Sequence, residues 1–360
     1  MTDRDSRAMC ALYRTDFRAF LQVAFRILHP HRVLTWHWIL DLFSDAVRQT
    51  MFTGEYNTLL AVPPRTLKSF VTSVALPAWL HGKDPRRAIL CLAESDRVAL
   101  AHRDRFSALI SSDKYLSIFS RRGGPSASVL AAGEGCDHLT FGGTLPKASP
   151  DAVIIDDPHA FKDEPDTGLL ASHRRWFEGR VLGEVSSSCR ILAVMSRVAL
   201  GDLTDAVREH AGWRAAEVPV LAREDEPRAS FLGHGPGRTR GDELNPGGMP
   251  RAALREKLRE IGARRFMARY QQQPYEPGNG RERGGALRMV ITGWHGKRCY
   301  SNAPAFGVIP EERALDLELF GEGSQGPALE LEPPIPLEML GEPLPDPDAD
   351  RANRQVLFGP

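Results

Sequence analysis

Lys68 and Ser69 are the first residues of this chain whose types and spacing could do chemistry. They follow an apolar run and a proline-containing loop in the stretch LLAVPPRTLKS, residues 59–69. If this stretch is a strand, a turn and a helix, the free N–H groups of the helix start, the lysine and the hydroxyl could bind phosphate and Mg²⁺. The phosphate-loop pattern G-x-x-x-x-G-K-[ST] has glycines where this chain has Val62 and Leu67. The stretch alone therefore fits nucleotide binding and a plain strand-turn-helix with a solvated Lys68 equally well.

Two adjacent carboxylates follow a second apolar run, in the stretch AVIIDDP, residues 152–158. At the carboxyl end of a buried strand, Asp156 could orient Mg²⁺ and Asp157 could polarise the attacking water of an NTPase. An aspartate pair before a proline also forms turns and helix caps. The nucleotide-site interpretation gains support because a Lys-Ser loop follows an earlier strand of the same pattern.

A third apolar run ends in Ser196-Arg197, within ILAVMSRVALGDL, residues 191–203. A polar pair at this strand end could sense the γ-phosphate and transmit its loss to a mobile part of the protein. Asp202 is placed to cap a helix that begins near Leu203. For Asp202, capping without any catalytic role is at least as good an interpretation.

Buried strands must position these three groups of residues. Apolar runs at 59–62, 88–92, 152–155 and 191–195 alternate with segments that are helical in part, such as 95–110 and 169–182. Continuous apolar strands that alternate with helices predict an α/β fold with a mostly parallel sheet covered on both faces. Residues 120–150 are rich in Gly and Ser, and we expect a hairpin or an irregular excursion there rather than a central strand.

Helices are expected on both sides of this alternating region. Apolar spacing predicts one amphipathic helix over 8–28 and a second after Thr35, its expected N-cap. A third helix should cover about 250–272, with an interruption at Gly262. Its basic residues could meet a phosphate backbone, but a solvated face is favoured.

Composition narrows the class of protein. The 360 residues contain 46 Lys+Arg and 46 Asp+Glu, so no global positive field favours nucleic acid. Five scattered cysteines without a C-x-x-C pair are typical of a reducing compartment without structural zinc. The charged N-terminus and the lack of a long apolar run predict a cytoplasmic protein that does not span a membrane.

The end of the chain changes in character. Residues 300–360 contain twelve acidic and three basic residues among many prolines, which predicts a largely disordered acidic tail. We expect four parts: N-terminal helices (1–55), a phosphate-loop core (56–222), a linker with a helical subdomain (223–280), and the tail (281–360).

Six motifs in order carry a family resemblance: VPPRTLKS, ALPAWLHGKDP, VIIDDP, SHRRWFEGRVL, AVMSRVALGDL and RFMARYQQQP. Over about residues 10–278 the chain resembles the large terminase subunit of tailed bacteriophages and prophages, the ATPase that packages DNA. It resembles the branch whose phosphate loop reads P-P-R-x-L-K-S, where leucine replaces the expected glycine. The resemblance implies a RecA-like (ASCE) P-loop NTPase fold that uses ATP and Mg²⁺.

The resemblance also implies roles for individual residues. It places the nucleotide at Pro64, Arg65, Thr66, Leu67, Lys68 and Ser69, with Arg65 sensing the γ-phosphate. Mg²⁺ would be served by Ser69 and Asp156, water activation by Asp157, and coupling by Ser196, Arg197 and Asp202.

Some implied roles have competing interpretations. Family members often carry Gln-Arg where this chain has Ser196-Arg197, which weakens the coupling assignment. Trp36 and His37 fall near the expected adenine site, although core packing explains Trp36 better. Arg174 and Arg175 could act on a neighbouring subunit or form salt bridges on a helix surface.

The implied partners are double-stranded DNA, a portal protein, a small terminase subunit and further copies of the chain in a ring, in the cytoplasm of a bacterial host. The family's RNase H-like nuclease is expected to be missing, because residues 281–360 offer no strands to hold a metal pair. Two alternatives remain at this stage. One is a non-catalytic remnant that keeps the fold; the other, less favoured, is a superfamily 2 helicase, for which no second RecA-like domain is evident.

Overall fold

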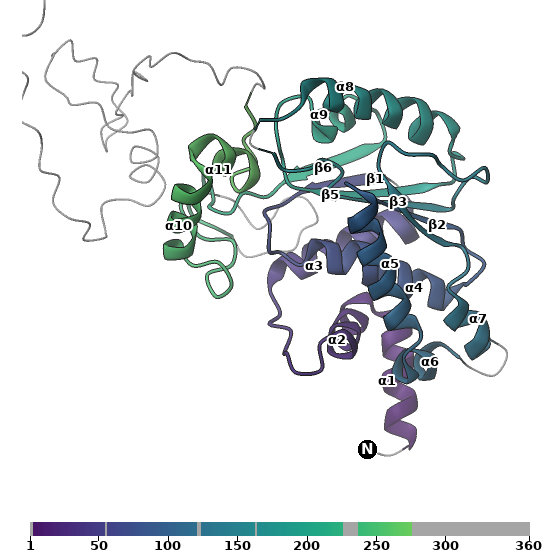
Figure 1. Cartoon of the computed structure of the whole chain (residues 1–360). Coiled ribbons are helices and arrows are strands. Elements are labelled where there is room, and N and C mark those ends of the chain that lie inside the picture. The colour runs from purple at the N-terminus through teal and green to yellow at the C-terminus, as the bar shows by residue number, and fades with distance from the viewer. Residues whose placement is uncertain (1–2, 55, 121–123, 163, 226–236, 276–360) are drawn as a thin grey trace, which may run out of the picture.

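A six-stranded parallel sheet forms the centre of the molecule (Figure 1). The computed structural model describes residues 3–54, 56–120, 124–162, 164–225 and 237–275. The strand order is β3-β2-β4-β5-β1-β6, and every pairing between neighbours is parallel. The strands are β1 (Asn57–Ala61), β2 (Ile89–Ala93), β3 (Cys136–Thr140), β4 (Ala152–Asp156), β5 (Arg190–Met195) and β6 (Trp213–Glu217). The α/β class and the four strands expected from apolar runs are thus confirmed.

Helices cover both faces of the sheet, and each face has its own apolar core (Figure 1). The helical elements before β5 are α1 (Asp3–Thr15), α2 (Phe17–Leu28), α3 (Trp38–Arg48), η1 (Gln49–Thr53), η2 (Phe70–Ala75), α4 (Leu76–Lys83), α5 (Asp96–Ile110), α6 (Asp113–Phe119), α7 (Ala127–Ala132), α8 (Thr167–Trp176) and η3 (Phe177–Leu182). Those after it are α9 (Leu203–Arg208), α10 (Arg251–Ile261) and α11 (Ala263–Arg269). Residues of α1 to α6 share the larger core, while η3 and α9 supply the core on the opposite face. Burial on both faces explains why β2 and β4 consist entirely of buried residues.

The helix expected over 8–28 is in fact two helices. Asp16 separates α1 from α2, because its carboxylate accepts hydrogen bonds from the backbone N–H groups of Arg18 and Ala19 and so caps α2. The next helix begins later than expected, since His37 rather than Thr35 is its N-cap and accepts from the Ile39 N–H through Nδ1. In both places the apolar spacing correctly predicted helical structure, and a local side-chain hydrogen bond determined where the helix begins.

The expectation of a hairpin or irregular excursion over 120–150 is wrong in part. This segment contains α7 and β3, and β3 pairs in parallel with β2 at one edge of the sheet. At the other edge lies β6, a strand that no apolar run announces, because all five of its residues are only half-buried. An edge strand pairs with a neighbour on one side only and is less buried than a central strand, so a purely apolar sequence is not needed to form it.

Helices α10 and α11 lie beside one end of the sheet (Figure 1). The expected interruption at Gly262 is confirmed: its backbone has φ 79°, a conformation that glycine adopts without strain. The preceding segment, expected to be a linker or surface loop, is anchored within residues 237–250, where the Leu244 N–H donates to Val220 O and the Leu244 side chain is buried. The expected acidic tail and the expected loss of the nuclease fall in residues 281–360, outside the described residues.

Two general properties concern the described part of the chain. Its four cysteines, Cys10, Cys91, Cys136 and Cys189, are free. None of its helices combines the length and the apolar character needed to cross a bilayer.

Candidate functional site

The loop after β1 bends sharply before a helical segment that starts at Lys68. Arg65 and Leu67 have φ values of 64° and 63°, in the left-handed region that glycine prefers. The buried Thr66 hydroxyl donates to Pro63 O at 3.0 Å and closes the turn. Leu67 therefore adopts a left-handed backbone conformation at a position where phosphate loops usually have glycine. Strained backbone conformations of this kind are found most often at functional sites.

Lys68 joins the ends of three neighbouring strands. The loop that carries it follows β1, and its ammonium lies 2.7 Å from Asp157 Oδ2, just after β4. The same Nζ donates to Ser196 Oγ, just after β5, at 2.6 Å. Because β5 lies between β1 and β4, the carboxyl ends of these strands converge on one point. Lys68, Asp157 and Ser196, which the sequence assigned to separate motifs, therefore meet in one cluster.

Ser196 fixes the other members of this cluster. Its backbone N–H donates to Asp157 Oδ1 at 2.7 Å, and its hydroxyl donates to Val62 O at 3.0 Å. Asp157 has φ 41°, so the catalytic candidate itself sits in a strained backbone conformation. Ser196 thus connects the loop after β1, through its hydroxyl, to Asp157, through its backbone N–H.

Asp156 is almost completely buried and only half satisfied. Its Oδ2 accepts from the Ser73 hydroxyl at 3.0 Å, while its Oδ1 is buried without a hydrogen-bond partner among the described residues. Burial, followed by the charge of Asp157, raises the pKa of Asp156 to about 7. His102 lies 3.8 Å from Oδ2, but burial lowers its pKa to about 4, so at neutral pH this histidine brings no positive charge.

The unpartnered oxygen fits a divalent cation. Mg²⁺ is bound by carboxylate and hydroxyl oxygens together with phosphate and water, and rarely by a cage made of protein alone. Asp156 Oδ1 could supply one such ligand, and Ser69, which lies close enough to hydrogen-bond to this carboxylate, could supply another. A cation there would offset the burial of the Asp156 charge.

Arg65 and Pro64 lie on the outer side of the loop. The Arg65 side chain is exposed, and among the described residues its guanidinium forms no hydrogen bond or ion pair. Pro64 is half-buried. The Arg65 side chain is therefore open to solvent.

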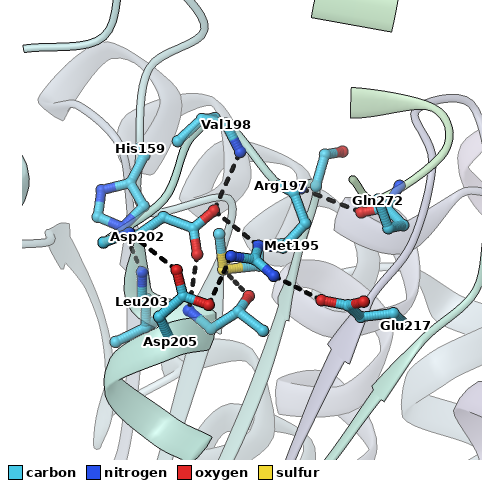
Figure 2. Close-up of polar contacts among 12 residues, drawn as sticks. His159, Met195, Arg197, Val198, Asp202, Leu203, Asp205, Glu217 and Gln272 are labelled. Atoms are coloured by element: carbon cyan, nitrogen blue, oxygen red, sulfur yellow. Dashed lines mark hydrogen bonds and ion pairs between the residues drawn. The ribbon is translucent and has the colours of Figure 1, made fainter. Parts of the chain in front are cut away.

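Arg197 and Asp202 lie in a second cluster, one residue beyond Ser196 (Figure 2). The guanidinium is 1% exposed and donates to three carboxylates: Asp202 at 2.9 Å, Asp205 at 2.7 Å and Glu217 at 2.5 Å. Burial disfavours the charged guanidinium, but the charge of Asp202 and its hydrogen bond outweigh burial and raise the pKa of Arg197. Asp202 also caps α9 as expected, since it accepts from the Thr204 N–H at 3.0 Å.

Two further residues of this region were not singled out in the sequence. His159 Nε2 accepts from the Leu203 N–H at 3.0 Å, while its Nδ1 lies 3.1 Å from His173 Nδ1. Burial lowers the pKa of His159 to about 3, so the ring is neutral. Gln272 Oε1 accepts from the Arg197 N–H at 3.1 Å (Figure 2). The only signals in the sequence were the position of His159 two residues after the carboxylate pair and the QQQ run after α11.

Three candidate residues, Trp36, His37 and Arg174, have local structural partners instead. Trp36 Nε1 donates to Asp41 at 3.2 Å, and His37 is the cap of α3 described above. Arg174 forms ion pairs with Glu178 at 2.9 Å and with Glu209. This pairing agrees with the salt-bridge interpretation of Arg174, whereas Arg175 is exposed.

The comparisons with known proteins give a limited result. No protein-family model and no curated protein matches this sequence. Among solved structures, the fold is similar to the crystal structure of the HK97 bacteriophage large terminase, with a TM-score of 0.42 and 16% sequence identity. The similarity covers 73% of this chain and 55% of that one, so the chain matches little more than half the length of that structure.

Proposed function

We propose that this chain is a Mg²⁺-dependent ATPase whose nucleotide binds at the carboxyl ends of β1, β5 and β4. One observation carries the proposal: the Lys68 ammonium, at the start of a helical segment, contacts Asp157 and Ser196 and acts electrostatically on Asp156, one buried oxygen of which has no hydrogen-bond partner within the described part of the chain. A cation at a helix start, a carboxylate pair and a strained loop are the parts that triphosphate binding and hydrolysis require.

The loop residues would act first, by binding the phosphates. Pro64 has no backbone N–H, so the N–H groups of Arg65 to Ser69 would surround the β- and γ-phosphates, as free N–H groups of a helix start do. Lys68 would exchange Asp157 for a phosphate oxygen and keep a charge-assisted hydrogen bond. Ser69 and Asp156 would hold Mg²⁺, which supplies positive charge against the phosphate oxygens.

Asp157 would then be free to act on water. Once Lys68 turns to the phosphates, the Asp157 carboxylate, 31% exposed and still held by the Ser196 N–H, can orient a water molecule and accept its proton. Arg65 would reach the γ-phosphate from the exposed side of the loop and stabilise the charge of the transition state.

We further propose that hydrolysis drives DNA packaging, as in the large terminase subunit. Support comes from the ordered motifs of residues 10–278, and from the convergence of three of them at the carboxyl ends of β1, β5 and β4. Ser196, Arg197 and Asp202 would couple the site to the rest of the molecule. The partners would be double-stranded DNA, a portal protein, a small terminase subunit and neighbouring copies in a ring, in the cytoplasm of a bacterial host, and the chain would carry no nuclease activity.

Hydrolysis is the test of this proposal. The purified full chain should hydrolyse ATP in Mg²⁺, and Lys68→Ala and Asp157→Ala should each lower turnover by at least about 100-fold. Lys147→Ala and Asp104→Ala remove exposed residues of the same types and should leave turnover unchanged.

Other outcomes have definite meanings. Equal turnover in all five proteins would overturn the assignment of the site. A folded chain that binds ATP without turnover would instead be a non-catalytic remnant. For the nuclease, plasmid DNA incubated with Mn²⁺ should remain uncut, and cleavage that survives rigorous purification would contradict its loss.

A further inference from the structure

We propose that Gln272 is the positioning residue through which the state of Asp157 reaches helices α10 and α11. The inference rests on the proposed nucleotide site and goes beyond it, because it names the contact that carries a change at the site to a distant element. Gln272 follows α11 in the chain, yet its side chain lies against the carboxyl end of β5 (Figure 2).

Two consecutive backbone N–H groups make this link. The N–H of Ser196 donates to Asp157 Oδ1 at 2.7 Å, and the N–H of the next residue, Arg197, donates to Gln272 Oε1 at 3.1 Å. The two rigid peptides that carry these donors meet at Cα of Ser196, so a movement of the first peptide must be taken up by rotation about the φ and ψ bonds of Ser196 or passed on to the second peptide. If Asp157 moves when Lys68 releases it, the peptide bound to Gln272 must respond.

The arginine side chain cannot absorb such a movement. Its guanidinium is held by three carboxylates and is fully buried (Figure 2). Moving it would break three charge-assisted hydrogen bonds, one of them to the fully buried Asp202. The part of Arg197 that can still move is its backbone peptide, whose N–H donates to Gln272 Oε1.

Gln272 is itself rigidly attached to α11. It is 1% exposed, its backbone has φ 54°, and its Nε2 donates to the carbonyl oxygen of Arg269, the last residue of α11, at 2.8 Å. A buried amide that uses its oxygen toward β5 and its nitrogen toward α11 connects the two elements directly. A displacement of its oxygen is therefore passed on to the helix.

The neighbouring Gln271 makes a different contact. Its Oε1 accepts from the Leu221 N–H at 2.9 Å, beyond the end of β6, and the Val220 N–H donates to Tyr270 O at 2.8 Å. This attachment leads to the far side of β1 and does not touch Asp157 or Ser196. Gln271 holds the helices to the sheet, while Gln272 links them to the strand end that carries the catalytic candidate.

Hydrogen exchange measured with nucleotide can test the relay. In the full wild-type chain, a non-hydrolysable ATP analogue with Mg²⁺ should change amide exchange in α10 or α11 by at least about fivefold, the lower end of typical coupling between sites. Gln272→Ala should lose this response and still bind the analogue, whereas Gln271→Ala should keep the response.

Gln272→Asn is a conservative second variant, which separates loss of the contact to Arg197 from a folding defect caused by alanine. Asparagine keeps the amide and favours the left-handed backbone, but it is one methylene shorter, so its oxygen should not reach the Arg197 N–H. It should lose the response as the alanine variant does. An unchanged response in either Gln272 variant, or equal loss in Gln271→Ala, would overturn the relay. A wild-type chain that binds nucleotide without any change in α10 and α11 would overturn the relay alone. Failure of the wild-type chain to bind nucleotide would overturn the proposed function, and the relay with it.

Discussion

Lys68 and Arg197 are two buried cations at the carboxyl end of the sheet, and their charges are balanced in opposite ways. Lys68 has one carboxylate partner, Asp157, which is itself 31% exposed, and one hydroxyl partner. Arg197 has three carboxylate partners, and both it and Asp202 are sealed from solvent. A ligand oxygen can replace the single carboxylate partner of Lys68, whereas a ligand that displaced the carboxylates of Arg197 would leave the fully buried Asp202 without its cation. The Lys68 cluster is therefore built for exchange and the Arg197 cluster for support.

The largest expected effect concerns the supporting cluster. Arg197→Ala should lower the free energy of unfolding by about 3–5 kcal/mol, because it leaves the fully buried Asp202 carboxylate without its cation. Denaturant unfolding measures this change. Arg208→Ala is the matched control, since Arg208 pairs with the same Asp205 and Glu217 from a half-exposed position and should cost at most about 1 kcal/mol. If the two variants were equally stable, the supporting role of Arg197 would be wrong.

The next effect depends on pH and concerns Asp156. Burial raises its pKa to about 7 in the folded protein, against about 4 when unfolded, so the folded state binds the extra proton between these values. Stability therefore falls as pH rises from about 4 to 7. Asp156→Asn removes this titration and should make the ligand-free protein more stable at pH 8 by about 1–3 kcal/mol.

The pH profile of that variant separates titration from packing. The stabilisation by Asp156→Asn should shrink as pH is lowered from 7 to 4, which thermal or denaturant unfolding at several pH values would reveal. A difference that stays constant over this range would show that the carboxylate is not held near its neutral form. The same variant should also lose Mg²⁺-dependent ATP binding, because Asp156 is the proposed Mg²⁺ ligand.

The smallest expected effect on stability belongs to Lys68. Lys68→Met keeps the length of the side chain and removes the charge, and Asp157 retains water and the Ser196 N–H as partners. The free energy of unfolding should change by no more than about 1 kcal/mol, as for partly exposed ion pairs. A loss as large as that of Arg197→Ala would remove the distinction between the two clusters.

Much of the sheet was predictable from the sequence, because strands buried on both faces need uninterrupted apolar runs. The edge strands β3 and β6 were missed for the same reason, since half-buried residues leave no such run. Helix boundaries at Asp16 and His37 depended on single side-chain hydrogen bonds, which apolar spacing does not report.

The site was predictable only as separate pieces. Lys68, Asp157 and Ser196 could be named from strand ends, but their mutual contacts depend on the strand order, which places β5 between β1 and β4. His159 and Gln272 could not be named, because their partners are backbone N–H groups 44 and 75 residues away. Their roles come from the packing of elements that are distant in sequence.

Calorimetric titration of the full chain with a non-hydrolysable ATP analogue and Mg²⁺ measures whether Lys68 exchanges Asp157 for a bound nucleotide. If Lys68 is the exchangeable cation, the wild-type chain should bind one analogue per chain. Lys68→Met, although stably folded, should bind at least about tenfold more weakly, the loss of one charge-assisted contact. Equal affinity in the two proteins, or no binding by the folded wild-type chain, would show that Lys68 is not the cation that holds the nucleotide.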